Sequence, residues 1–246
     1  MASYPPSVNA IRQRLLAEQP ELMRLPGGLV SALCRLAARP GLEESVAEAT
    51  RWSQGLLGEP SVERLAPLTE LLLTEQYDLG KGQPILLTDP PASLLDYFRG
   101  VKRVWLCRGQ SLTLRDGRRI GEELLSVGIE PRPFGTTNRC LTGELTELAE
   151  EGDGVLWAAS GSFRLGGFVQ HYSPAELAEF AEQRNLSGAV YLDAWQEPLP
   201  ETCLPTFVST PSDIGFAVGY APKKQEQPDE AVIRPLFNWL RENLSD

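Results

Sequence analysis

Short apolar runs that alternate with helix-like segments are the feature that most constrains how this chain can fold. Apolar runs of strand length recur between residues 83 and 220, and segments with helical periodicity separate most of them. Parallel strands need a crossover connection, usually a helix, so this alternation is typical of α/β folds. The sequence therefore predicts a mainly parallel sheet with helices on both faces. The expected strands are 83–88, 104–107, 128–134, 154–159, 188–193, 206–209 and 214–220.

Prolines and glycines divide the chain into three expected regions. Residues 1–58 contain three amphipathic segments separated by such breakers, which predicts a small N-terminal helical region. Gly58 to Pro60 is the expected boundary. Residues 61–222 follow as the α/β core, beginning with a leucine-rich helix, and residues 230–246 form a closing C-terminal helix with leucines on one stripe.

A polar cluster from Gly135 to Arg139 follows one of the predicted strands. Open α/β sheets bind ligands in the crevice at the C-terminal ends of their strands, and glycine lets the backbone approach a ligand closely. The alternative is a polar turn in which Thr137 or Asn138 caps the next helix. Both interpretations place this cluster at the edge of the sheet where a site is expected.

Three motifs in succession resemble the bacterial selenocysteine synthase family, the L-seryl-tRNA(Sec) selenium transferases. The motifs are Arg-Gly-Gln at 108–110, Gly-Thr-Thr-Asn-Arg at 135–139 and Ser-Phe-Arg-Leu-Gly-Gly-Phe at 162–168. They have the order and approximate spacing of RGE, GTTNR and TSN[FY]RIxGF in that family, and the likeness is best over about residues 98 to 220. The resemblance implies the large domain of the fold type I pyridoxal-phosphate transferases.

The resemblance also implies where a cofactor site would lie. Asp193, at the end of a strand, matches the acid beside the cofactor's pyridine nitrogen, or else it caps the following turn. Ser93 lies in the turn that would hold the cofactor phosphate, where its simpler role is an N-cap. The remaining candidates, for a ligand or an anion, are Arg108, Thr136, Thr137, Asn138, Arg139 and Arg164.

Several departures from the family pattern indicate lost catalysis. The family's Schiff-base lysine lies in a hairpin that is shortened here to 209–215 and contains no lysine, and Pro90 and Pro91 remove backbone donors from the phosphate turn. A C-terminal small domain is not expected either. We therefore expect a non-catalytic binding or assembly protein with no catalytic residues and no cofactor. The alternative is a pyridoxal-phosphate-dependent transferase that uses Lys223, Lys224 or a partner's lysine.

The cysteines show no spacing typical of a metal site. Cys34, Cys107, Cys140 and Cys203 lie far apart in the sequence, and His171 is the single histidine. We expect buried thiols that behave as small hydrophobic side chains, a loop role for His171 and no bound metal.

Charge bears on the class of partner. The net charge is −10 and the calculated isoelectric point is about 4.8, which argues against DNA or tRNA as a partner. One local basic group, Arg115, Arg118 and Arg119, fits a solvated helix start. No apolar run approaches the roughly 20 residues of a membrane span, and a cytoplasmic protein is expected. The partner expected is another copy of the chain or another protein, with Trp195 and Trp239 as interface candidates.

Overall fold

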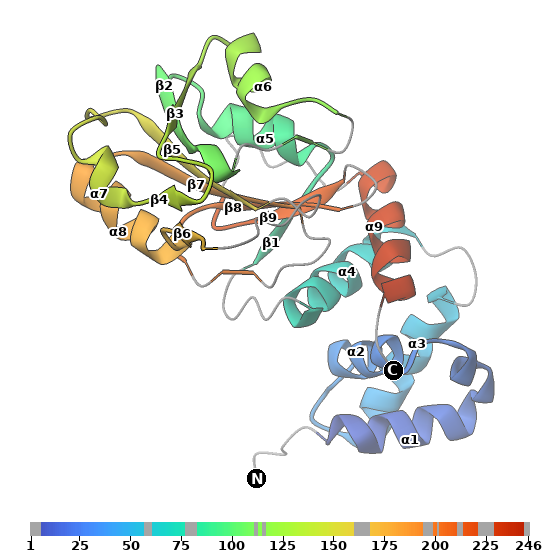
Figure 1. The fold of residues 1–246 in the computed structure, drawn as a ribbon. Helices are drawn as coiled ribbons and strands as arrows, with labels where there is room; N and C mark the ends of the chain where they lie inside the picture. Colours follow the sequence, from blue (N-terminus) through green and yellow to red (C-terminus); the bar gives the residue numbers. More distant parts are fainter. Residues whose placement is uncertain are drawn as a thin grey trace. The chain divides into compact units, whose positions relative to one another are not determined.

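The computed structural model describes most of the chain, which divides into two compact units (Figure 1). One unit combines Met1–Gly80 with Gln227–Asp246, and the other is Lys81–Glu226. The boundary expected at 58–60 therefore lies inside the first unit, and the helix after it belongs with the helical residues instead of the sheet. The described residues are 6–56, 61–76, 83–110, 113–114, 117–159, 168–193, 199–200, 202–210, 214–220 and 229–243.

The first unit is helical, as the sequence predicted for its N-terminal part. Buried apolar side chains of α1, α2 and α3 form its core, including Ile11, Leu33 and Val46. The helix α4 packs against α9, which explains why these two segments share a unit although they are far apart in sequence. The helices are α1 (Val8–Glu18), η1 (Pro20–Arg24), α2 (Gly27–Leu36), α3 (Leu42–Leu56), α4 (Val62–Gln76) and α9 (Glu230–Asn243).

The second unit is built on a seven-stranded sheet with the order β1-β9-β8-β7-β5-β2-β3. Neighbouring strands are parallel except at β9, which is antiparallel to both β1 and β8. The mainly parallel sheet predicted from the sequence is confirmed. The strands are β1 (Pro84–Leu87), β2 (Arg103–Cys107), β3 (Glu130–Phe134), β5 (Gly154–Ala159), β7 (Ser187–Asp193), β8 (Thr206–Ser209) and β9 (Gly215–Val218).

Helices cover both faces of this sheet, and the side chains of the central strands β2 and β5 alternate between two apolar cores. Leu106 and Leu156 face the core that contains Leu94 of α5 (Pro90–Tyr97) and Leu124 of α6 (Ile120–Ser126). The neighbouring side chains Trp105, Cys107 and Val155 belong to the other core, with Leu145 of α7 (Thr142–Leu145) and Leu177 of α8 (Pro174–Arg184). This period of two is what a strand buried on both faces produces.

The sequence of β3 explains why this strand lies at the edge of the sheet. Pro131 and Pro133 have no backbone N–H, so this strand suits an edge position better than a central one. Its one described partner is β2. Beyond β3 the chain turns at Gly135 and enters a second, two-stranded sheet, in which β4 (Arg139–Cys140) runs parallel to β6 (Gln170–His171).

The helix α5 begins earlier than the sequence suggested. The segment from Pro90 to Ser93 was expected to form the phosphate turn, whereas the helix starts at Pro90 and Asp89 is its N-cap. Proline is well tolerated in the first turn of a helix, where an N–H would lack an intrahelical acceptor. Among the described helices, none is both long enough and apolar enough to cross a membrane.

The N-terminus of α8 gives a first testable prediction. Ser173 accepts a hydrogen bond from Glu176 N at 3.1 Å, and Glu176 accepts one from Ser173 N at 2.7 Å, which is a capping box. Replacing Ser173 by alanine is expected to lower the free energy of unfolding by about 1 kcal/mol in urea titrations. The control is Ser126→Ala, an exposed serine whose hydroxyl donates to the backbone oxygen of Glu123 in its own helix, and an equal loss in both variants would contradict the capping role.

Candidate functional site

The C-terminal ends of the parallel strands gather the candidate residues at one edge of the sheet. Cys107 ends β2, Phe134 ends β3 and Asp193 ends β7, and the chain continues from these positions into the segments singled out in the sequence. The short helix η2 (Arg108–Gln110) follows β2 directly, and the turn at 135–139 follows β3. The edge predicted for a site is therefore the edge at which these motifs lie.

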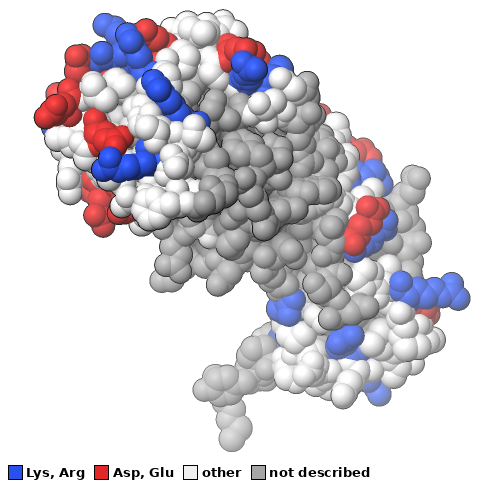
Figure 2. Space-filling model, in the orientation of Figure 1, with Lys and Arg blue, Asp and Glu red and all other residues white. Residues whose placement is uncertain are grey.

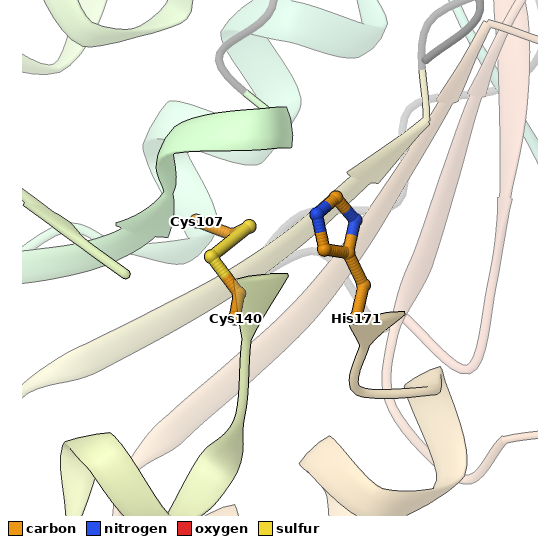
Figure 3. A group of neighbouring side chains, drawn as sticks. All are labelled: Cys107, Cys140 and His171. Atoms are coloured by element: carbon orange, nitrogen blue, oxygen red, sulfur yellow. A yellow bond between two sulfur atoms is a disulfide. The ribbon is translucent and has the colours of Figure 1, made fainter. Parts of the chain in front are cut away.

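A disulfide joins Cys107 to Cys140, and His171 lies beside it (Figure 3). The Cα atoms of the two cysteines are 6.0 Å apart, and the sulfur atoms and an imidazole nitrogen all lie within 4.8 Å of one another. The prediction of four separate thiols was wrong for this pair. The parallel strands β2 and β3 end side by side, and the turn after β3 carries Cys140 back to the end of β2. The prediction of a buried free thiol is confirmed for Cys34 and wrong for Cys203, which is exposed.

Two glycines make room for this cluster. A Cβ atom on Gly109 would overlap the Thr137 carbonyl oxygen and would lie 2.7 Å from His171 Nε2. Gly135 has a φ of 63°, and a Cβ there would overlap the sulfur of Cys140. Glycine is therefore needed at both positions for the close approach of the three segments.

Hydrogen bonds within the turn from Gly135 to Arg139 use most of its polar groups. Thr136 N donates to Arg139 O at 2.8 Å, and Arg139 N donates to Thr136 Oγ1 at 3.1 Å. Asn138 Nδ2 donates to Phe168 O at 3.3 Å, which ties the turn to the segment before β6. The alternative in which Thr137 or Asn138 caps the next helix is wrong, because Leu141 is the N-cap of α7.

The candidates for binding an anion at this edge are exposed wherever the structure describes their side chains. Arg108 and Arg139 are both exposed, and each directly follows or precedes a cysteine of the disulfide. Thr136, Thr137 and Asn138 are exposed as well. Arg164 lies outside the described residues. Asp193 is placed by its backbone alone, which pairs in register with Ser209 of β8.

Tyr172 packs beside the cluster and contacts the segments that carry it, a role that was not predicted from the sequence. Its ring stacks on Phe134 with centroids 5.9 Å apart, and Trp157 Nε1 donates to its carbonyl oxygen at 3.2 Å. Burial raises the pKa of the Tyr172 hydroxyl, so the group stays neutral and donates a hydrogen bond. That bond reaches Gln110 Oε1 at 3.4 Å and links the residue after β6 to η2. The one sequence signal for this role of Tyr172 was its position next to the single histidine.

The N-terminus of α5 does not fit the phosphate of pyridoxal phosphate. Pro90 and Pro91 have no N–H, Ala92 N already donates to the carboxylate of Asp89 at 2.9 Å, and Ser93 N donates to Asp89 O at 3.0 Å. The backbone N–H groups of the first turn are thus absent or already bonded, and the carboxylate of Asp89 occupies the place of an anion. Ser93 is not the N-cap that was expected, because Asp89 takes that position.

Lys102, the one lysine among the described residues, does not lie at this edge. The chain between β8 and β9 contains no lysine, and Thr210 donates through both N and Oγ1 to Ile214 O, at 2.8 Å each. Lys102 precedes β2 and lies at the opposite edge of the sheet. Lys81, Lys223 and Lys224 lie outside the described residues.

Comparisons with known proteins define the fold of the chain. No protein-family model matches it, and no curated protein does. Among solved structures, it is similar to D-glucosaminate-6-phosphate ammonia-lyase, with 13% identity and a TM-score of 0.51 over 78% of this chain and 61% of that one. It is also similar to N-succinyldiaminopimelate aminotransferase from Mycobacterium tuberculosis, with 12% identity and a TM-score of 0.40 over 97% of this chain and 59% of that one. The chain thus spans less than two thirds of either protein.

These similarities identify the fold of the protein. The protein has a mixed α/β fold with a mainly parallel central sheet flanked by helices, and it shares this fold with the ammonia-lyase over 78% of the chain. This part of the sequence prediction is confirmed. At this level of identity the likeness is one of fold, and a fold alone does not determine an activity.

Proposed function

We propose that this protein is a non-catalytic relative of the selenocysteine synthase family that acts as a binding or assembly protein. The observation that carries the proposal is the first turn of α5, where Asp89 takes the donor that a cofactor phosphate would need. A phosphate placed there would meet a carboxylate instead of free N–H groups. No cofactor is therefore expected, and no catalytic residue is assigned.

The distribution of lysines supports the same proposal. A Schiff base requires a lysine within reach of the bound cofactor. The β8–β9 connection has none, and Lys102 precedes β2 at the edge opposite to Cys107 and Asp193. The alternative, a pyridoxal-phosphate-dependent transferase, is kept because Asp193 ends β7 at the expected edge. It requires a lysine from a partner or from Lys223 or Lys224.

Surface charge favours a protein partner over a nucleic acid. Acidic and basic side chains are interspersed on the visible face of the sheet unit instead of gathering in one basic patch (Figure 2). Arg118 pairs with Glu123 at 3.0 Å and Arg119 with Glu122 at 3.8 Å, as expected for a solvated helix start. Arg115 lies outside the described residues. We propose a homo-oligomer or a complex with another protein, in the cytoplasm.

A titration with pyridoxal phosphate tests the proposal. With increasing protein, the absorption spectrum of the cofactor is expected to stay that of the free compound, because neither the phosphate nor the aldehyde finds a partner. A new band that saturates at one cofactor per chain, and that disappears when one of the four lysines is replaced by alanine, would establish the transferase alternative. The mass in solution, compared with 27.1 kDa for one chain, tests self-association in the same sample.

A further inference from the structure

The Cys107–Cys140–His171 cluster has the composition and the spacing of a metal site. Zinc binds thiolate sulfur at about 2.3 Å and imidazole nitrogen at about 2.0 Å in tetrahedral geometry, so its ligand atoms lie roughly 3.5 to 3.8 Å apart. The two sulfurs and the imidazole nitrogen here all lie within 4.8 Å of one another. Once the sulfurs are no longer bonded, side-chain rotations that shift atoms by about 1 Å suffice to reach zinc geometry.

We propose that Cys107, Cys140 and His171 bind one zinc ion when the disulfide is reduced. A dithiol reductant supplies two electrons and two protons, the S–S bond breaks to give two thiols, and the reductant leaves as its own disulfide. Zinc binding then releases the two thiol protons to solvent and forms two Zn–S bonds and one Zn–N bond. This site is independent of the proposed function, because it needs neither the fold family nor a cofactor.

Charge favours zinc at this position. Both cysteines are fully buried among apolar side chains such as Trp105 and Leu177. Two thiolates in such a core would be strongly unfavourable alone, but two thiolates and one divalent ion sum to zero charge. Soft sulfur ligands with an imidazole select zinc over magnesium or calcium, which prefer oxygen ligands.

A contact with the backbone of Thr137 positions the imidazole of His171 to act as a metal ligand. Its Nε2 lies 3.1 Å from the carbonyl oxygen of Thr137, which can only accept, so this nitrogen carries the proton in the disulfide form. Ligation through Nε2 moves that proton to Nδ1 and exchanges the bond to Thr137 for a bond to the ion. The side chain is half-buried, whereas the cysteines are buried. The ion therefore reaches the site from the histidine side, where a water completes the coordination.

The redox state of the pair decides whether the site exists. Disulfides are rare in reducing compartments, where thioredoxin and glutathione keep thiols reduced. In such a compartment the pair is present as two thiols and zinc binds. In an oxidising environment the disulfide excludes the ion, because both sulfurs lose the charge that a ligand needs.

The test uses the full chain, zinc ions and a phosphine reductant, which does not compete as a thiol ligand. After reduction, incubation with zinc and removal of free metal, elemental analysis is expected to find about one zinc per chain, against none for the untreated disulfide form. His171→Ala is expected to weaken zinc binding at least about 100-fold in a chelator competition assay. This variant leaves both cysteines and the disulfide in place. In the reduced wild type, cobalt is expected to give the absorption of tetrahedral thiolate coordination.

The matched control is Cys203→Ser, an exposed free cysteine outside the cluster. It is expected to bind zinc as the wild type does, whereas Cys107→Ser and Cys140→Ser lose binding. The proposal is overturned if the reduced wild type keeps no zinc while circular dichroism shows it folded. It is also overturned if the disulfide form binds equally well, or if His171→Ala binds with unchanged affinity.

Discussion

Replacing Asp153 by alanine is expected to lower the free energy of unfolding by about 3 to 4 kcal/mol. Asp153 is 3% exposed and stands directly before β5. Its carboxylate accepts bonds from Trp105 Nε1 at 2.9 Å, from Arg103 Nε at 2.9 Å and from Glu150 N at 3.1 Å. Without it, the buried indole N–H has no described acceptor and the Arg103 charge loses its buried partner. Guanidinium unfolding curves measure the loss.

The control for this prediction is Glu18→Ala, which removes one partner of an exposed pair with Arg14 and is expected to change stability by less than about 1 kcal/mol. Burial alone would raise the pKa of Asp153, but hydrogen bonds from Trp105, Glu150 N and Arg103 outweigh it and lower the pKa. A lowered folded-state pKa adds stability above the unfolded-state pKa, and this stability is lost as the pH falls through the folded-state value. The difference between the wild type and Asp153→Ala should therefore shrink at acidic pH, and a constant difference would contradict the assigned bonds.

Loss of the Cys107–Cys140 disulfide is expected to lower the free energy of unfolding by about 4 kcal/mol. The bond links residues 33 positions apart, and a cross-link of that loop length removes conformational entropy from the unfolded chain by about this amount. Unfolding with and without a phosphine reductant, in the presence of a chelator that removes metal, measures the effect. Cys203→Ser is the control, because its thiol is free and exposed.

Two further results bear on the disulfide. Adding zinc to the reduced protein is expected to restore part of the lost stability, because the ion binds the folded state. An unchanged unfolding curve on reduction, together with non-reducing peptide maps that show Cys107 and Cys140 unlinked, would contradict the pairing.

The sheet was predictable from the sequence because burial on both faces leaves a local mark. The apolar runs around Leu106, Leu156 and Val190 each fit a strand covered by helices, and the segments between them have helical periodicity. The assignment of α4 was not predictable in the same way. A leucine-rich amphipathic helix shows that one face is buried, but not which surface buries it, and here that surface includes α9.

The cysteine–histidine cluster depends on topology and was missed for that reason. Its residues are separated by 33 and 31 positions, and no local spacing marks them. One signal was present: Cys107 ends one predicted strand, and Cys140 follows the end of the next one by a few residues. The ends of neighbouring parallel strands lie together. The pairing of Cys107 with Cys140 could therefore be predicted only if β2 and β3 were known to be neighbours, which the sequence alone did not establish.

The start of α5 could have been predicted more closely. Aspartate followed by proline is a common helix start, with the acid as N-cap and the proline in the first turn. Residues 89–93 carry this pattern, but the family resemblance directed attention to a phosphate turn. The resulting helix has buried prolines and a capped first turn, which is the basis for the absence of cofactor chemistry in the proposed function.

Borohydride trapping tests the central claim most directly. The full chain is incubated with a stoichiometric amount of pyridoxal phosphate, treated with borohydride to fix any Schiff base, and examined by intact mass and peptide mapping. The proposed function predicts an unmodified mass for the bulk of the protein and no single preferred lysine. One phosphopyridoxyl group per chain, mapped to Lys81, Lys102, Lys223 or Lys224, would contradict it.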